Sequence, residues 1–158
     1  MYKAASREAF RLLKESNARV SFAESLTGGR IAAALIENSG ASAVIDESYV
    51  TYAPESKIRL LGVKRETVEE KGVVSAECAR EMAEGVRKIS AADWGVSATG
   101  LAGPDGGTEE TPVGTVFIGI ASARGAHSHE CHFAGDRESV RLQAVTRAFE
   151  LLCEAIKA

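Results

Sequence analysis

Hydrophobic residues recur every three to four positions in some stretches of the chain and alternate with polar residues in others. The first spacing is typical of helices with one buried face, and the second of strands. Helices are predicted at Tyr2–Ser16, around Ile31–Ile36, at Pro54–Gly62, at Glu66–Lys71, from Ser75 to about Val86, and from Asp136 to about Leu152. Strands are predicted at Arg19–Ala23, Ser48–Tyr52, Asp93–Thr99, Thr115–Ala121 and His127–Phe133.

The order of these elements predicts the fold class. Strands alternate with helices through the first two thirds of the chain, which is typical of parallel strands joined by helical crossovers. The last two strands are joined by a short turn at Arg124-Gly125, which is typical of an antiparallel pair. We therefore predict an α/β fold, with a mixed sheet flanked by helices and residues 1–158 forming a single domain.

Composition narrows the function classes. The chain is 45% hydrophobic and 26% charged, as in an average globular protein, and its net charge is −3. The sequence contains no basic stripe of the kind that nucleic-acid binding needs. No apolar stretch approaches the roughly 20 residues of a membrane span. The charged N-terminus does not resemble a signal peptide, and three widely spaced cysteines do not form a disulfide framework. We expect a cytoplasmic protein with neither a nucleic acid nor a membrane as partner.

A polar, glycine-rich loop follows the first predicted strand and precedes a helix. It has the sequence Ala23-Glu24-Ser25-Leu26-Thr27-Gly28-Gly29. Unpaired backbone N–H groups at a helix start attract anions, and small residues allow close approach. Ser25, Thr27 and Gly28 are therefore candidate substrate-binding residues. The alternative is an ordinary capped turn, since the loop matches neither a Walker motif nor a GxGxxG fingerprint.

Ser42, Tyr52 and Lys57 supply the groups of a serine hydrolase that uses no histidine. A serine hydroxyl needs a base to become a nucleophile, and a lysine amine serves when burial or a cationic neighbour lowers its pKa. A nearby tyrosine can relay the proton. The histidines lie far downstream, so a Ser-His-Asp triad has little support. These three residue types also occur together by chance, and the spacing alone leaves the set open.

Two further segments are candidates for substrate binding. Thr99 and Gly100 begin a long glycine-rich loop at the end of a predicted strand, a common ligand position in α/β folds. Arg137 and Arg141 lie four residues apart at the start of the last helix and share a face. The helix dipole favours anions at that end, so a bound phosphate would explain them. The alternatives are a plain connecting loop and two solvated arginines.

His127, His129 and Cys131 would share one face of a strand, with His132 beside them. Zinc uses such ligands, but they usually come in a compact turn with partners from elsewhere in the chain. A solvated strand face is the simpler interpretation. We therefore predict no metal and no cofactor.

Taken together, the segments resemble the CinA C-terminal family over nearly the whole chain. The matching features are AESLTGG at Ala23–Gly29, the serine after Gly40, VTY at Val50–Tyr52, Lys57, GVVS at Gly72–Ser75, TGLAGPDGG at Thr99–Gly107, PVGTV at Pro112–Val116, and FAGDR at Phe133–Arg137 with Arg141. Each motif is weak alone, but their order and spacing are specific. Pro54 and Thr111 depart from the family pattern, which often has asparagine and lysine there.

The resemblance implies an amidohydrolase that converts nicotinamide mononucleotide (NMN) to nicotinate mononucleotide and ammonia. It also implies serine, tyrosine and lysine machinery, falling on Ser42, Tyr52 and Lys57, and a homodimer. Two alternatives remain: a non-catalytic nucleotide-binding or regulatory module, and an amidase for another pyridine or nucleotide substrate. Ammonia release from NMN separates them.

Overall fold

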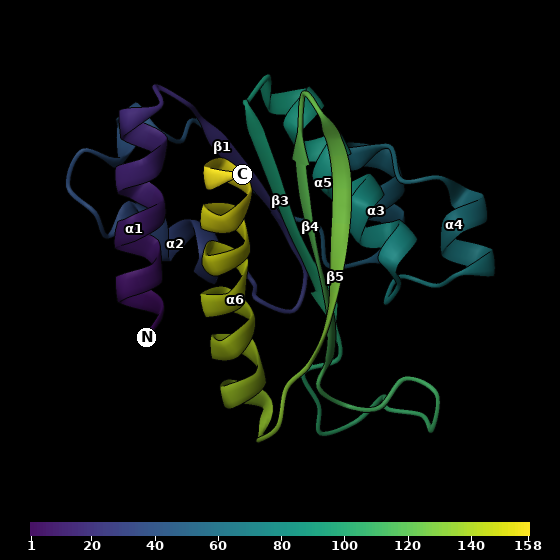
Figure 1. Ribbon diagram of the computed structural model, residues 1–158. Coiled ribbons are helices and arrows are strands. Elements are labelled where there is room, and N and C mark those ends of the chain that lie inside the picture. The colour runs from purple at the N-terminus through teal and green to yellow at the C-terminus, as the bar shows by residue number, and fades with distance from the viewer.

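A five-stranded mixed sheet forms the centre of the computed structural model, which describes residues 1–158 (Figure 1). Its order is β2-β1-β3-β4-β5. The strands are β1 (Val20–Glu24), β2 (Tyr49–Val50), β3 (Trp94–Gly100), β4 (Thr115–Ser122) and β5 (Gly125–His132). Strand β1 pairs in parallel with β2 and β3, whereas β3, β4 and β5 pair antiparallel. The predicted α/β fold with a mixed, helix-flanked sheet is confirmed.

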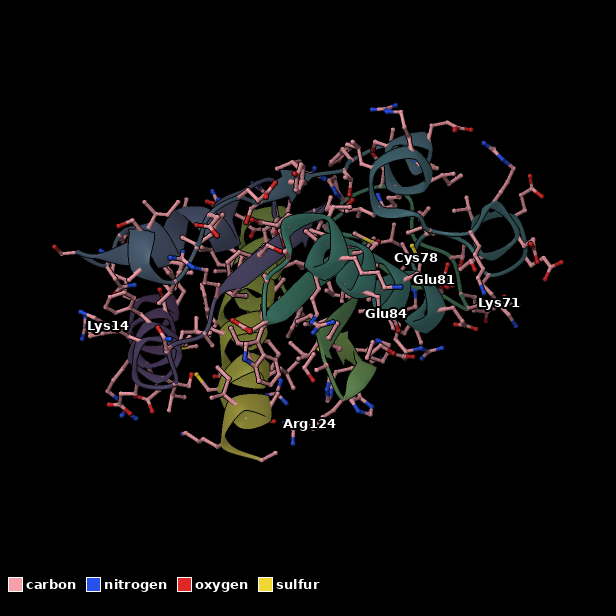
Figure 2. The ribbon with its side chains drawn as sticks, turned by 90° about the horizontal axis from the view of Figure 1, so that it is seen from above. Lys14, Lys71, Cys78, Glu81, Glu84 and Arg124 are labelled. Carbon is pink, nitrogen blue, oxygen red and sulfur yellow. The ribbon has the colours of Figure 1, made fainter.

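Helices cover both faces of the sheet, as the views in Figures 1 and 2 show. One layer contains α1 (Tyr2–Glu15), α2 (Arg30–Ile36) and α6 (Arg137–Lys157); a short 3₁₀ turn, η1 (Ala41–Ala43), follows α2. The other layer contains α3 (Pro54–Leu61), α4 (Arg65–Glu70) and α5 (Ala76–Ser90). None of these helices is both long and apolar enough to cross a membrane.

The side chains of β1 alternate between the two layers. Phe22 is fully buried and packs edge-on against Phe149 of α6, with 6.0 Å between ring centroids. Ala23 belongs to the smaller core on the other face, with Leu61 of α3 and Met82 of α5. Because successive strand residues face opposite sides, Glu24 points toward the α2 layer and Ser25 toward the α3 layer.

Some predicted ends of helices and strands agree with the structure, and others differ from it. The side chains of Ser75 and Asp136 accept hydrogen bonds from the amides of Cys78 and Ser139, which confirms both expected helix caps. Strand β1 extends to Glu24, which the sequence analysis had placed in the loop. Strand β2 has only two residues instead of five, since it is an edge strand paired only at Tyr49 and Val50.

The carboxyl ends of the parallel strands meet at one edge of the sheet. The segments after β1, β2 and β3 therefore lie near one another, together with the first turn of α6. In open α/β sheets this edge is where ligands bind. The sheet thus gathers most of the predicted site residues.

Candidate active site

Lys57 of α3 is buried directly behind the loop that follows β1. Its side chain is fully buried, and its Nζ lies 3.3 Å from Ser25 Oγ. The same Nζ lies 2.6 Å from the carbonyl oxygen of Thr51 and 3.2 Å from that of Tyr52. Three oxygens therefore surround one amine nitrogen, and only one of them can lose a proton.

These contacts accommodate both protonation states of the lysine. The ammonium form donates to all three oxygens. After loss of one proton, two N–H donors remain for the two carbonyls and the lone pair can face the Ser25 hydroxyl. Burial lowers the pKa of the Lys57 ammonium below its ordinary value, which the nearby Cys78 thiol partly opposes. Burial also raises the pKa of Cys78 to about 11, so this thiol is itself neither base nor nucleophile at neutral pH.

Ser42 lies at the other end of β1. We expected Lys57 within hydrogen-bond reach of Ser42 or Tyr52, and the structure places it against the carbonyl of Tyr52 and not against Ser42. The Ser42 carbonyl accepts a hydrogen bond from Arg19, which precedes β1, and Ile45 forms a bridge with Val20. Val20 and Glu24 are four residue steps apart along the strand, about 13 Å at 3.3 Å per residue. The chain runs parallel to β1 between positions 45 and 50, which carries Tyr52 and Lys57 away from the exposed Ser42.

Tyr52 is close to the buried pair, but not in the predicted way. Its backbone carbonyl meets Lys57, whereas its side chain is 63% exposed. Its hydroxyl lies 3.5 Å from Nη2 of Arg137 and is not a partner of Lys57. The predicted proton relay through this hydroxyl therefore lacks the necessary contact. The side chain of Tyr52 instead lies on the surface beside Arg137.

Glu24 fills the anion site that was predicted at the start of α2. Its carboxylate is 1% exposed and accepts hydrogen bonds from the amides of Gly29, Ile31 and Ala32, at 3.1, 2.9 and 3.0 Å. The positive end of the helix is thus neutralised from within the chain. These three amides are therefore already paired and are not free to bind a phosphate. The sequence does not predict this role, because the predicted strand ends at Ala23 and the observed strand ends at Glu24.

Replacing Glu24 with alanine should lower the free energy of unfolding by about 2–4 kcal/mol, because it leaves buried amides without an acceptor at a helix start. Urea unfolding at neutral pH measures this. The matched control is Glu84→Ala, since Glu84 is exposed on α5 (Figure 2). Equal stability of the two variants would contradict the capping role.

The two predicted arginines both reach the loops of this edge. Arg137 donates to the carbonyl of Gly103 at 2.7 Å. Arg141 donates from Nε to the carbonyl of Leu26 at 2.7 Å and from Nη2 to that of Thr27 at 3.3 Å. The ion pairs of the molecule use other side chains. Two guanidinium groups that form no ion pair therefore lie at the same edge of the sheet as the Ser25–Lys57 pair.

Thr99 and Gly100 also lie at this edge, where the structure gives each a local role. The Thr99 hydroxyl donates to the carbonyl of Val73 at 2.8 Å, which ties the start of α5 to the sheet. A Cβ at Gly100 would come within 2.6 Å of the carbonyl of Thr115, so close strand packing requires glycine. By contrast, the hydroxyls of Thr27 and Thr51 are buried without any hydrogen-bond partner. Thr51 was not among the predicted site residues.

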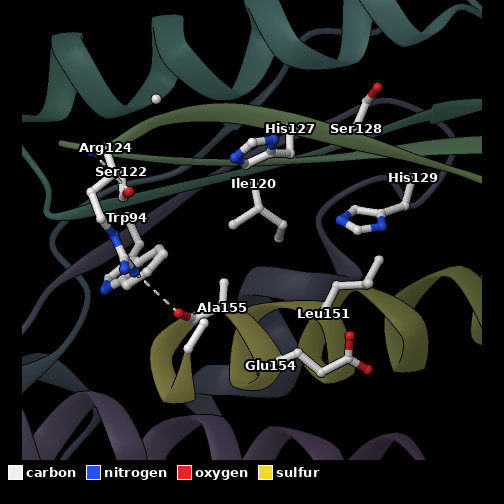
Figure 3. A pocket seen from close by; sticks show the side chains of 12 residues that line it. Trp94, Ile120, Ser122, Arg124, His127, Ser128, His129, Leu151, Glu154 and Ala155 are labelled. Atoms are coloured by element: carbon white, nitrogen blue, oxygen red, sulfur yellow. Dashed lines mark hydrogen bonds between the residues drawn. The ribbon is translucent and has the colours of Figure 1, made fainter.

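A separate cavity of about 550 Å³ lies between β5 and α6 (Figure 3). His127 and His129 line it together with Trp94 and Leu151, and Arg124 donates to the carbonyl of Ala155 at its rim. No group of three or more histidine, cysteine, aspartate or glutamate side chains is placed to hold a metal ion. Strand β5 is the far edge of the sheet, so this cavity is separate from Ser25 and Lys57.

Comparison with known proteins places the whole chain in one family. The CinA C-terminal domain model matches residues 3–156. The chain belongs to the CinA C-terminal domain family. A CinA-like protein of Endomicrobium trichonymphae is 50% identical over 142 residues, which cover 90% of this chain and 33% of the relative. For a CinA-like protein of Fervidobacterium nodosum the identity is 44% over 147 residues, covering 93% and 36%. The chain thus spans about a third of these curated relatives.

Solved structures of CinA proteins share the fold. The competence/damage inducible protein CihA from Agrobacterium tumefaciens has a TM-score of 0.95 and 38% identity, covering 99% of this chain and 96% of its own. The CinA superfamily protein from Escherichia coli has a TM-score of 0.93 and 32% identity, covering 98% and 90%. These names state a family and no reaction.

The two departures from the CinA pattern lie outside the buried pair. Pro54 is the first residue of α3, where its fixed backbone angle suits a helix start. Thr111 lies in the exposed loop after β3 and bonds to Thr108 through its amide and carbonyl. Neither side chain is a hydrogen-bond partner of Lys57.

Proposed function

We propose that this CinA domain hydrolyses the carboxamide of NMN to nicotinate mononucleotide and ammonia, with Ser25 as nucleophile and Lys57 as base. The observation that carries the proposal is the contact of a fully buried lysine with Ser25 Oγ at 3.3 Å. A buried amine with a lowered pKa is the base that a serine hydroxyl needs when no histidine is near.

The reaction has two halves. Ser25 Oγ bonds to the carboxamide carbon while its proton moves to Lys57 Nζ, and the carbonyl π electrons move to oxygen. When the tetrahedral species collapses, the C–N bond breaks and the leaving nitrogen takes the proton from Lys57 as ammonia. Water then attacks the acyl ester and gives a proton to Lys57. The C–Oγ bond breaks, and Ser25 Oγ takes that proton back.

The choice of a nucleotide substrate rests on charge and on family resemblance. NMN carries the same reacting amide as nicotinamide, so an enzyme that prefers NMN must recognise the ribose phosphate. Arg137 is exposed, forms no ion pair, and lies next to the exposed ring of Tyr52. Arginine gives planar, charge-assisted bonds to phosphate. We therefore place the phosphate at Arg137, with the amide at Ser25.

Replacing Arg137 with alanine should raise KM for NMN by about 10- to 150-fold, because a charged hydrogen bond contributes roughly 1.5–3 kcal/mol of binding. Steady-state ammonia release measures this. The KM for nicotinamide riboside, which lacks the phosphate, should not change. An unaltered KM for NMN would place phosphate recognition elsewhere.

The proposed function itself is tested by incubating the wild-type chain with NMN, nicotinamide riboside and nicotinamide and measuring ammonia. We expect release from NMN at the highest kcat/KM of the three. Tight NMN binding without ammonia release would identify a non-catalytic nucleotide-binding module instead. Faster release from another amide would identify a different substrate.

A further inference from the structure

The backbone amides of Leu26 and Thr27, which directly follow Ser25, donate no hydrogen bond within the chain. Their neighbours all have acceptors: Ser25 N donates to Ala98, Gly28 N to Ser25, and Gly29 N to Glu24. Leu26 is 4% exposed and Thr27 is fully buried. Buried N–H groups without a partner are rare in folded proteins, so two in succession need a reason.

Thr27 has a second unpaired group. Its side-chain hydroxyl is also buried without a partner. The turn therefore presents three unpaired polar groups immediately beside the proposed nucleophile. Hydrogen-bond donors left free at such a place are suited to an oxygen that carries negative charge only during the reaction.

Arg141 binds the carbonyl side of one of these two peptide groups. Its Nε donates to the carbonyl of Leu26 at 2.7 Å, and that carbonyl belongs to the peptide whose N–H is the amide of Thr27. Its Nη2 donates at 3.3 Å to the carbonyl of Thr27, in the next peptide group of the turn. A cation bound to a peptide oxygen fixes the plane of the peptide and polarises its N–H, which makes it a stronger donor.

Gly28 makes this contact sterically possible. Its φ is +60°, which side chains other than glycine rarely adopt, and a Cβ there would lie 3.1 Å from Arg141 Nη2. Glycine at this position therefore lets the Arg141 guanidinium lie directly against the turn. Arg141 lies in the second turn of α6, on a different element from both Ser25 and Lys57.

We propose that the amides of Leu26 and Thr27 form the oxyanion hole of this enzyme, and that Arg141 positions the turn that carries them and polarises the amide of Thr27. The inference rests on the proposed function for its substrate. In the first step, the π electrons of the amide carbonyl move to oxygen as Ser25 Oγ bonds to carbon, and the two N–H groups receive that charge. Arg141 is thus a positioning residue, and the phosphate is left to Arg137.

Replacing Arg141 with glutamine should lower kcat by about 10- to 100-fold and change KM for NMN by less than about threefold, since losing one whole oxyanion donor costs about 10²–10³ in kcat. The same loss of kcat should appear with nicotinamide riboside. Arg141→Lys should recover part of it, because the ammonium can reach one carbonyl. Gly28→Ala should show a similar loss. The matched control is Arg147→Gln on the same helix, which should leave kcat unchanged.

A second assay separates this inference from the choice of substrate. An alkyl fluorophosphonate places its phosphoryl oxygen where the carbonyl oxygen would lie, while Ser25 Oγ bonds to phosphorus and fluoride leaves. The rate of Ser25 labelling, followed by intact-protein mass, should fall in Arg141→Gln by the same factor as kcat. Thermal unfolding of each variant shows that it is folded.

The outcomes are distinct. Labelling that depends on Arg141, in a protein that releases no ammonia from NMN, would support the oxyanion hole and refute the proposed substrate. A raised KM for NMN with unchanged kcat and labelling in Arg141→Gln would overturn the inference and make Arg141 a phosphate ligand. Absence of Ser25 labelling in the wild-type chain would also overturn it.

Discussion

Replacing Ser25 with alanine is expected to lower kcat for ammonia release from NMN by about 10⁴-fold or more, since loss of a serine nucleophile removes nearly all turnover. Replacing Ser42 with alanine is expected to leave kcat within about twofold, because distant sites act independently. The contrast follows from the positions of the two serines at opposite ends of β1, only one of them beside Lys57.

The measurement is single-turnover and steady-state ammonia release by both variants under identical conditions. Both variants should fold, since each change removes a single oxygen atom. Full activity in Ser25→Ala together with loss of activity in Ser42→Ala would restore the assignment that the family resemblance implied. The buried contact between Lys57 and Ser25 would then need a purely structural explanation.

Replacing Lys57 with methionine is expected to lower kcat by about 10²–10⁴-fold, the usual contribution of a general base. Methionine fills a similar volume without an amine. Lys57→Arg should be as inactive, because a guanidinium does not lose its proton in this pH range. Ammonia release by the two variants, beside the wild type, tests the role. Retention of more than about a tenth of kcat in either variant would argue against a general base.

The pH dependence of the wild type tests the same role. Only neutral Lys57 accepts the serine proton, so kcat/KM should rise with pH as this amine titrates. Because burial lowers the pKa of Lys57, the rise should be centred below the ordinary lysine value of about 10.4. The rise should be missing from any residual activity of Lys57→Met.

The stability of the lysine variant should move in the opposite direction to its activity. A lowered pKa in the folded state means that the unfolded chain binds the proton more tightly. The free energy of unfolding then rises with pH between the folded and unfolded pKa values of Lys57. Where Lys57 is protonated, the wild type buries a charge that Lys57→Met does not, so at such a pH the variant should be at least as stable in urea.

The fold could be predicted from the sequence because its signals are local. Periodicity in α1, α5 and α6, the caps at Ser75 and Asp136, and the short turn between β4 and β5 each need only a few neighbouring residues. The end of β1 was harder to predict. Glu24 is polar and precedes a glycine-rich segment, so the local sequence predicts a loop. In the structure its buried carboxylate accepts hydrogen bonds from three backbone amides at the start of α2.

Part of the site could be predicted from the sequence, because several of its residues follow the ends of predicted strands. Ser25, Lys57 and both arginines were singled out, but the pairing of lysine with serine was not recoverable from spacing. Ser42 is nearer to Lys57 in sequence, and only the parallel course of β1 and β2 shows that Ser25 is nearer in space. The free amides of Leu26 and Thr27 have no side-chain signal at all, because they belong to the backbone.

Trapping of the acyl-enzyme tests the central claim most directly. Wild-type protein mixed with NMN and quenched in acid within one turnover should carry an added mass equal to NMN less ammonia. Peptide mapping should place that group on Ser25, and Ser25→Ala should carry none. An acyl group found on Ser42, or on any other residue, would contradict the account.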